Sequence, residues 1–166
     1  MSVTRIAING FGRIGRNAFK IARERSDLEI VAINDLTDTK TLAYLLKHDS
    51  NYGEYSRQVD FTENELIVEG QAVKVLAEKD PANLPWGEMN VDVVIESTGL
   101  FTDKDGAGKH LTAGAKRVVI SGPTKSDGVD TIVLGTNDSK IKDATPIVSN
   151  ASCTTNSLGA VMAVLD

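Results

Sequence analysis

The sequence predicts a doubly wound α/β fold, in which a mostly parallel sheet has helices on both faces and carries one antiparallel excursion. Short apolar runs alternate with helical patterns along the 166 residues, a length that suits one domain. A glycine-rich turn joins the first apolar run to the first helical pattern. The strand–helix–strand spacing makes parallel pairing the default. We expect the sheet domain at residues 1–150 and a separate segment that opens a further helix at residues 151–166.

The chain begins with two strand–helix pairs. Residues 3–9 and 29–34 are short apolar runs that predict buried strands. The helix between them is expected to bury one face, made of Ile14, Ala18, Ile21 and Ala22. Residues 39–47 predict the second helix, with Asp38 as its N-cap. The expected buried residues of this second helix are Leu42, Leu45 and Leu46.

The middle of the chain differs, because short strands follow one another without helices. Three runs are separated by polar turns: residues 57–61, 65–68 and 72–75. The most notable of these polar turns lies at Glu69 and Gly70. Short strands joined by such turns pair antiparallel, so this part predicts the antiparallel excursion.

The last third returns to the parallel pattern. A strand at residues 91–95 precedes a helix, which Thr102 and Asp105 open with capping-box spacing and which ends near Gly114. Three short runs complete the sheet: residues 117–120, 131–134 and 147–149. A final helix, capped by Ser152, carries an apolar stripe of Leu158, Val161, Met162 and Leu165.

Gly10, Gly12 and Gly15 form a GxGxxG pattern that follows a strand and opens a helix. The first glycine permits a tight turn, the second lets a pyrophosphate approach the backbone, and the third lets helix and strand pack closely. Asp35 ends the second strand, twenty residues beyond Gly15. Its carboxylate accepts hydrogen bonds from a ribose and repels a 2′-phosphate. The pattern predicts a Rossmann dinucleotide site that prefers NAD to NADP, the alternative being a structural turn beside a surface aspartate.

Two other loops follow predicted strands, at residues 96–99 and 121–123. In a doubly wound sheet, ligands bind beyond the carboxyl ends of the strands. The small hydroxyl side chains of Ser97, Thr98 and Ser121 are therefore candidates to line the cofactor cleft. Ordinary turns are the alternative for each loop.

Cys153 is the only cysteine and stands in the first turn of the last predicted helix. A helix N-terminus with its unpaired N–H groups favours the thiolate form, which is the nucleophile. A small buried hydrophobic residue is the alternative. His48 and His110 lie near the C-terminal ends of helical patterns, and we expect both to be surface residues rather than catalytic bases.

Composition and charge exclude several classes of protein. The net charge is −5 and the charges are well mixed, which argues against nucleic acid as the main partner. The two histidines and one cysteine are too scattered for a metal site of the zinc type. The N-terminus has no signal-peptide pattern, and every apolar run is far shorter than the ~20 residues that span a bilayer. With a lone free thiol, these features predict a cytoplasmic protein without a membrane partner.

Taken together, several segments closely resemble the phosphorylating glyceraldehyde-3-phosphate dehydrogenase family. The segments with the strongest resemblance are residues 9–16, 34–38 and 149–156, supported by residues 45–50, 80–86 and 96–102. The most specific motif is Ser-Cys-Thr-Thr-Asn at residues 152–156. The resemblance runs through the whole chain, and it implies the NAD-binding half of such an enzyme, the nucleophile segment and the start of the interdomain helix.

The resemblance also implies a reaction. The Cys153 thiolate would attack the aldehyde of D-glyceraldehyde 3-phosphate, hydride would pass to NAD, and inorganic phosphate would cleave the resulting thioester to 1,3-bisphosphoglycerate. Ser152 and Thr154 would flank the nucleophile and help to bind substrate or inorganic phosphate. A homotetramer is expected for the full enzyme.

Cofactor contacts are implied in the same way, for Gly10, Phe11, Gly12, Arg13, Ile14, Gly15, Asn34, Asp35, Lys79, Ser97, Thr98, Gly99 and Ser121. Arg13 and Ile14 would contact the pyrophosphate and Asp35 the adenosine ribose. Lys79 stands where the family often has arginine beside the adenine, so the charge stays but the planar stacking surface is lost. Ser121 would lie near the nicotinamide end.

The chain also departs from the family. The histidine that serves as base and part of the phosphate sites belong to a later segment of the family that is absent from this sequence. We therefore expect the chain alone to bind NAD without turnover. One alternative is erythrose-4-phosphate dehydrogenase, whose members usually carry glutamate at the position of Asp35. Another is a stand-alone NAD-binding module with a redox-sensing thiol.

Overall fold

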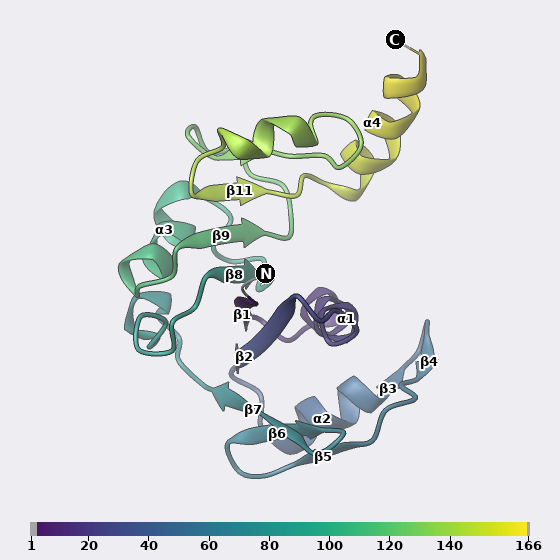
Figure 1. The fold of residues 1–166 in the computed structure, drawn as a ribbon, viewed down its shortest axis with the longest axis vertical. Coiled ribbons are helices and arrows are strands. Elements are labelled where there is room, and N and C mark those ends of the chain that lie inside the picture. The colour runs from purple at the N-terminus through teal and green to yellow at the C-terminus, as the bar shows by residue number, and fades with distance from the viewer. Residues whose placement is uncertain (1–2, 166) are drawn as a thin grey trace.

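The computed structural model describes residues 3–165 and contains one main sheet with helices on both faces (Figure 1). The strands of this sheet are β1 (Thr4–Asn9), β2 (Leu28–Asn34), β5 (Val59–Phe61), β6 (Glu65–Val68), β7 (Gln71–Leu76), β8 (Val93–Glu96), β9 (Arg117–Ile120), β10 (Asp130–Thr131) and β11 (Ile147–Ser149). The helices are α1 (Arg13–Ala22), α2 (Thr39–Lys47), α3 (Lys104–Thr112) and α4 (Cys153–Leu165), with short 3₁₀ helices η1 (Pro81–Asn83) and η2 (Asp138–Lys142). A separate antiparallel hairpin is formed by β3 (His48–Asp49) and β4 (Gly53–Glu54).

The strand order confirms the doubly wound α/β fold. The sheet runs β10-β11-β9-β8-β1-β2-β7-β6-β5. Every pair from β10 to β7 is parallel, whereas β6 pairs antiparallel with both β7 and β5. The predicted antiparallel excursion is therefore confirmed, and its last strand returns to the parallel sheet beside β2. Because β1 lies between β2 and β8, the carboxyl ends of these three strands are adjacent.

The turn between β6 and β7 is a tight hairpin turn at Glu69 and Gly70, as expected. Glu69 and Gly70 both have positive φ, at 52° and 76°. Two successive residues with positive φ give the twist that matches a tight antiparallel hairpin, and glycine adopts that conformation without steric cost. Glu69 is held in this conformation from the residue before β5, because its side chain accepts from Gln58 N–H at 2.7 Å.

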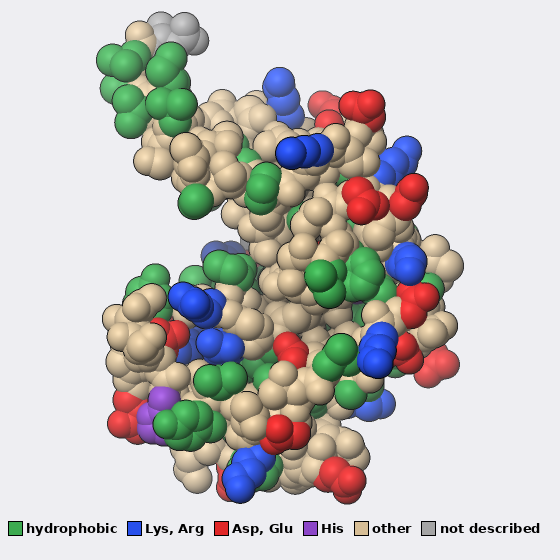
Figure 2. Space-filling view, turned by 180° about the vertical axis from the view of Figure 1, so that it is seen from behind, with side chains coloured by type: hydrophobic (Ala, Val, Ile, Leu, Met, Phe, Trp, Pro, Cys, Tyr) green, Lys and Arg blue, Asp and Glu red, His purple; other side chains and the backbone are tan. Residues whose placement is uncertain are grey.

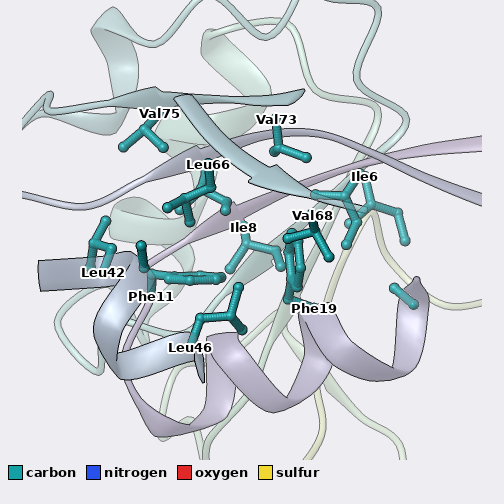
Figure 3. Packing of buried hydrophobic residues seen from close by; sticks show 14 residues of the cluster. Ile6, Ile8, Phe11, Phe19, Leu42, Leu46, Leu66, Val68, Val73 and Val75 are labelled. Atoms are coloured by element: carbon teal, nitrogen blue, oxygen red, sulfur yellow. The ribbon is translucent and has the colours of Figure 1, made fainter. Parts of the chain in front are cut away.

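One face of the sheet packs against α1 and α2 around a single apolar cluster (Figure 3). Phe11 and Phe19 lie at its centre, with ring centroids 5.5 Å apart and planes at 88°, an edge-to-face contact. Figure 3 shows Leu42 and Leu46 of α2 beside these rings, and Leu66 and Val68 of β6 facing them. The cluster therefore joins the excursion to the first strand–helix unit.

The predicted buried face of α1 is wrong in part. Gly15, Phe19 and Ala22 are the buried residues of this helix, whereas Ile14 and Ile21 are 56% and 65% exposed. Gly15 touches the strand end directly, so the helix axis lies close to the sheet on that side. Gly15, Phe19 and Ala22 are spaced i, i+4 and i+7 and form the buried face, so Ile14 and Ile21 lie outside it.

Helix α2 begins and ends where the sequence predicts. The Asp38 carboxylate accepts a hydrogen bond of 2.9 Å from the Thr41 backbone N–H. This bond, with a second from the Thr41 hydroxyl, lowers the pKa of Asp38. Leu42 and Leu46 are buried as expected, while Leu45 is only half-buried.

Two other predictions about the helices are wrong. The residue that caps α3 is Asp103, whose carboxylate accepts from Gly106 N–H at 2.7 Å, and the expected Thr102 cap is not used. His110, expected at the surface, is fully buried on α3. It faces Trp86, a residue of the loop that covers the second face of the sheet. A ring buried with polar partners on another segment gives no signal in helical spacing.

The last part of the sheet is shorter than expected, since β10 ends at Thr131 instead of Leu134. Asn137 explains the early end: its side chain accepts from Val133 N–H at 2.7 Å and donates to Thr131 C=O at 2.9 Å. These two bonds turn the chain toward η2.

Helix α4 projects from the end of the sheet (Figure 1). Hydrophobic side chains gather on its surface in Figure 2, and Leu158, Val161 and Met162 are each more than half exposed. Across residues 3–165, none of the helices combines the length and apolar composition needed to cross a bilayer.

Candidate functional site

A pocket of about 290 Å³ opens at the carboxyl ends of β1, β2 and β8. It is lined by Asn9, Gly10, Gly12, Asn34, Asp35, Leu36, Glu78, Lys79, Ser97, Thr98, Leu100 and Phe101. Seven of these residues are among the predicted cofactor contacts: Gly10, Gly12, Asn34, Asp35, Lys79, Ser97 and Thr98. The remaining five are additions that only the structure supplies.

The three glycines of the turn have different surroundings. Gly10 has φ +89°, and a Cβ placed on it would lie 2.7 Å from the Thr98 backbone nitrogen. Gly15 packs against Ile8 and the Gly10 carbonyl, where a Cβ would overlap existing atoms. A Cβ on Gly12 would point into open space. The first and third glycines therefore serve packing, and Gly12 leaves room for a ligand beside the backbone.

Helix α1 starts directly at this opening, with Gly12 as its N-cap. Glycine has no side chain to cap the first turn, so the N–H groups of that turn remain available to an anion. The helix dipole favours negative charge at this end. Arg16 lies behind the turn, and its guanidinium donates to the Phe11 carbonyl at 2.9 Å. Burial lowers the pKa of Arg16, an effect that Asp49 and Asp35 oppose through their charges.

Asp35 forms one wall of the pocket and also joins two loops. Its Oδ2 accepts from Phe11 N–H at 2.7 Å, and its Oδ1 accepts from Thr37 N–H at 2.9 Å. Each carboxylate oxygen has two acceptor positions, so each keeps one for a ligand hydroxyl. The same bonds fix the carboxylate next to the glycine turn.

The other predicted cofactor residues are divided between the pocket edge and the core. Phe11 is buried, and only its backbone faces Asp35. Arg13 and Ile14 are exposed on the first turn of α1, and Arg13 lines a neighbouring hollow with Tyr44 and His48. Gly99 is exposed with φ +76°. Ser121 is half-buried at the end of β9, outside the lining of the pocket.

A buried polar cluster extends from the floor of the pocket into the core, and Asn34 is the one member of it that was predicted as a site residue. Asn9, Asn34 and Glu96 end the three adjacent strands and are each at most 4% exposed. His110 contacts Glu96 from α3, with Nε2 and Oε2 2.9 Å apart. The one available signal in the sequence is a glutamate that directly follows an otherwise apolar strand run.

Cys153 begins α4 at the same edge of the sheet, after β11. Ser152 caps this helix as predicted, accepting from Thr155 N–H at 3.0 Å. Asn156 binds back to the carbonyls of Asn150 and Ser152 at 2.8 and 2.9 Å. Ala151, before the cap, has φ +61°, a strained conformation for a residue with a side chain. Several hydrogen bonds thus hold this turn in one conformation. Cys153 and Thr154 are exposed in it.

Comparisons with known proteins agree with this geometry. The family model described as "Glyceraldehyde 3-phosphate dehydrogenase, NAD binding domain" matches residues 4–104. The chain is 53% identical over 165 residues to the glyceraldehyde-3-phosphate dehydrogenase of Thermotoga maritima, covering 98% of this chain and 49% of that protein. It is 54% identical over 166 residues to that of Borreliella burgdorferi, covering 97% and 49%. A cytosolic relative from Trypanosoma brucei brucei is 52% identical over 164 residues, covering 99% and 49%.

The chain therefore spans about half the length of the curated relatives it matches. The matched residues 4–104 include the glycine turn, Asp35 and the buried polar ends of β1, β2 and β8. The match of the family model and the high identity over nearly the whole chain both point to one assignment. This chain belongs to the glyceraldehyde-3-phosphate dehydrogenase family, and it contains the NAD-binding domain of that family.

Proposed function

We propose that the chain is the NAD-binding part of an enzyme that oxidises and phosphorylates D-glyceraldehyde 3-phosphate to 1,3-bisphosphoglycerate. The observation that carries the proposal is that two features lie at one edge of the sheet. A dinucleotide pocket and an exposed cysteine at a helix N-terminus both lie at the carboxyl ends of the parallel strands. This combination suits a reaction that joins a bound cofactor to a covalent nucleophile.

The residues around the pocket fit NAD. Gly12 and the first turn of α1 offer room and N–H groups for the pyrophosphate, and Asp35 offers acceptors for the adenosine ribose. Lys79 is exposed at the pocket edge, on the side of the adenine in the proposed assignment. Bound NAD would supply a hydride acceptor.

Cys153 is the proposed nucleophile. Its thiolate adds to the substrate aldehyde, and after oxidation the sulfur carries the acyl group as a thioester. Inorganic phosphate then attacks the thioester carbon, the C–S bond breaks, and the thiolate returns with release of the acyl phosphate. Cys153 is exposed in the first turn of α4, and Ser152 and Thr154 flank it as proposed contacts for substrate or phosphate. A homotetramer in the cytoplasm is proposed for the full enzyme.

Two glycine variants should separate folding from cofactor binding. Gly10→Ala is expected to destabilise the chain by about 1–3 kcal/mol, because its Cβ must displace the Thr98 backbone and its φ is positive. Gly12→Ala should unfold like the wild type but bind NAD more weakly, since its Cβ occupies the space left for the ligand. Urea unfolding and calorimetry measure the two effects, and equal stability of both variants would contradict the prediction.

Calorimetry with NAD and NADP tests the proposed function directly. The chain is expected to bind NAD more tightly, and Asp35→Ala should narrow the preference by removing the ribose acceptor and the charge that repels a 2′-phosphate. Asp60→Ala, which changes an exposed aspartate of β5, is the matched control and should leave the preference unchanged. Tighter binding of NADP by the wild type would refute the assignment of Asp35.

A further inference from the structure

The buried cluster beneath the pocket contains a carboxyl group and a histidine that the proposed reaction does not use. Glu96 and His110 are 1% and 0% exposed. Burying an ionised carboxylate is costly unless hydrogen bonds compensate. The protonation state of both groups follows from the hydrogen bonds that surround them.

Trp86 determines the tautomer of His110. The indole Nε1–H can only donate, and it lies 2.9 Å from His110 Nδ1. Nδ1 must therefore be the unprotonated, accepting nitrogen. The single ring proton is then on Nε2, which faces Glu96 Oε2 at 2.9 Å. The Asn9 amide nitrogen lies 3.3 Å from the same Nε2, and with Nε2 protonated it donates to Glu96 Oε2 and not to the ring. His110 is neutral and donates to the carboxylate.

Glu78 determines the orientation of the two asparagines in the same way. The Glu78 backbone N–H donates to Asn34 Oδ1 at 2.8 Å, so the Asn34 amide nitrogen must face Asn9 Oδ1, at 2.7 Å. The Asn9 amide nitrogen is then turned toward Glu96 Oε2 and donates to it. The Glu78 backbone N–H therefore fixes the orientation of both asparagine side-chain amides.

Thr98 supplies the remaining donors. Its backbone N–H lies 2.8 Å from Glu96 Oε1, and its hydroxyl also contacts that oxygen. The same hydroxyl accepts from Leu100 N–H at 3.0 Å, which leaves its proton for the carboxylate. Glu96 thus receives four donors on two oxygens, and a carboxylate that only accepts is ionised.

We propose that ionised Glu96 is a positioning residue of the cofactor pocket, a role that rests on the proposed NAD site. Its carboxylate joins the ends of β1, β2 and β8, directly through Asn9 and Thr98 and through Asn9 to Asn34. These strand ends lead into the two walls of the pocket, at Asp35 and at Thr98. Glu96 also holds Thr98 against Gly10, where a Cβ on residue 10 would lie 2.7 Å from the Thr98 backbone nitrogen.

Glu96→Gln is the isosteric test. The glutamine amide has two orientations. In one, its NH₂ group faces the two Thr98 donors, and in the other it faces the Asn9 and His110 donors, so two donors lose their acceptor in each case. We expect amide exchange at Thr98 to accelerate and the Kd for NAD to rise, each about 10-fold. Glu29→Gln is the control, because Glu29 lies on β2 but pairs with Arg5 at the surface, and it should change neither quantity.

Thr98 variants distinguish positioning from simple stabilisation. Thr98→Val removes the hydroxyl while Glu96 stays, and it should weaken NAD binding, whereas Thr98→Ser should retain it. The Glu96→Gln, Thr98→Val double variant should bind NAD no more weakly than whichever single variant binds it less tightly. The reason is that both changes break the same contact, between Glu96 and Thr98. Wild-type affinity in Glu96→Gln, or fully additive losses, would overturn the proposal. If Glu96→Gln fails to fold, the contrast between Thr98→Val and Thr98→Ser decides.

The assignment of protons has its own readout in the free chain. Nitrogen NMR of the imidazole should show His110 protonated at Nε2 and bare at Nδ1, and a proton on Nδ1 would overturn the proposal. Amide exchange at Thr98 also needs no cofactor. If the wild type failed to bind NAD, the proposed function would fall, while these two measurements would still decide whether Glu96 positions the loop.

Discussion

Purified residues 1–166 are expected to form NADH from glyceraldehyde 3-phosphate on the order of 1000-fold or more slowly than a relative of full length. A nucleophilic thiol needs a partner base to reach its full activity, and loss of such a partner typically costs several orders of magnitude. Within residues 3–165, the one hydrogen-bond contact of Cys153 Sγ is the Thr154 hydroxyl, at 4.0 Å. His110 cannot serve, because it is buried between Trp86 and Glu96.

The assay compares NADH absorbance for this chain, its Cys153→Ser variant and the Thermotoga maritima relative in one buffer. The Cys153→Ser variant gives the rate without the proposed nucleophile. We expect the chain to lie close to that variant and far below the relative. A rate within tenfold of the relative would show that residues 1–166 already contain a sufficient base.

Phe19→Ala should be among the most damaging single changes in the core. Phe19 is fully buried in an edge-to-face contact with Phe11, which belongs to the glycine turn (Figure 3). Removing a buried phenylalanine costs about 3–5 kcal/mol, a large part of the ~5–15 kcal/mol that stabilises a typical domain. The loss should also loosen the glycine turn, because Phe11 loses the ring against which it packs.

Urea unfolding followed by circular dichroism measures this effect. Phe61→Ala is the matched control, since Phe61 lies on β5 with its side chain 41% exposed. Its cost should be near 0.5 kcal/mol, as is typical of surface positions. Similar losses of stability in the two variants would mean that the cluster between α1, α2 and the sheet is not the main source of stability.

Local signals in the sequence were enough for several elements. The bounds of α2 follow from the Asp38 cap and from leucines at helical spacing, and both act within one or two turns. The hairpin at Glu69 and Gly70 follows from the glycine in a polar turn between two short strand runs. The pocket is predictable because the glycine turn follows β1 and Asp35 follows β2, and these two strands are adjacent in the sheet.

Other features depended on segments that are distant in the sequence. Ile14 and Ile21 have the spacing of a buried face, but the close contact of Gly15 with the strand end rotates that face to the outside. The end of β10 depends on the side chain of Asn137, which accepts from Val133 N–H. A pattern of apolar residues gives no indication of that hydrogen bond.

By itself, the sequence determined the fold class, the cofactor and the position of the thiol, because glycine turns, helix caps and alternating strands act over a few residues. Only the tertiary structure decided that Glu96 and His110 are buried together beneath the pocket. Their partners Asn9, Thr98 and Trp86 come from β1 and from two separate loops. A buried charge is stable only where such distant donors converge, and that convergence is a property of the folded chain.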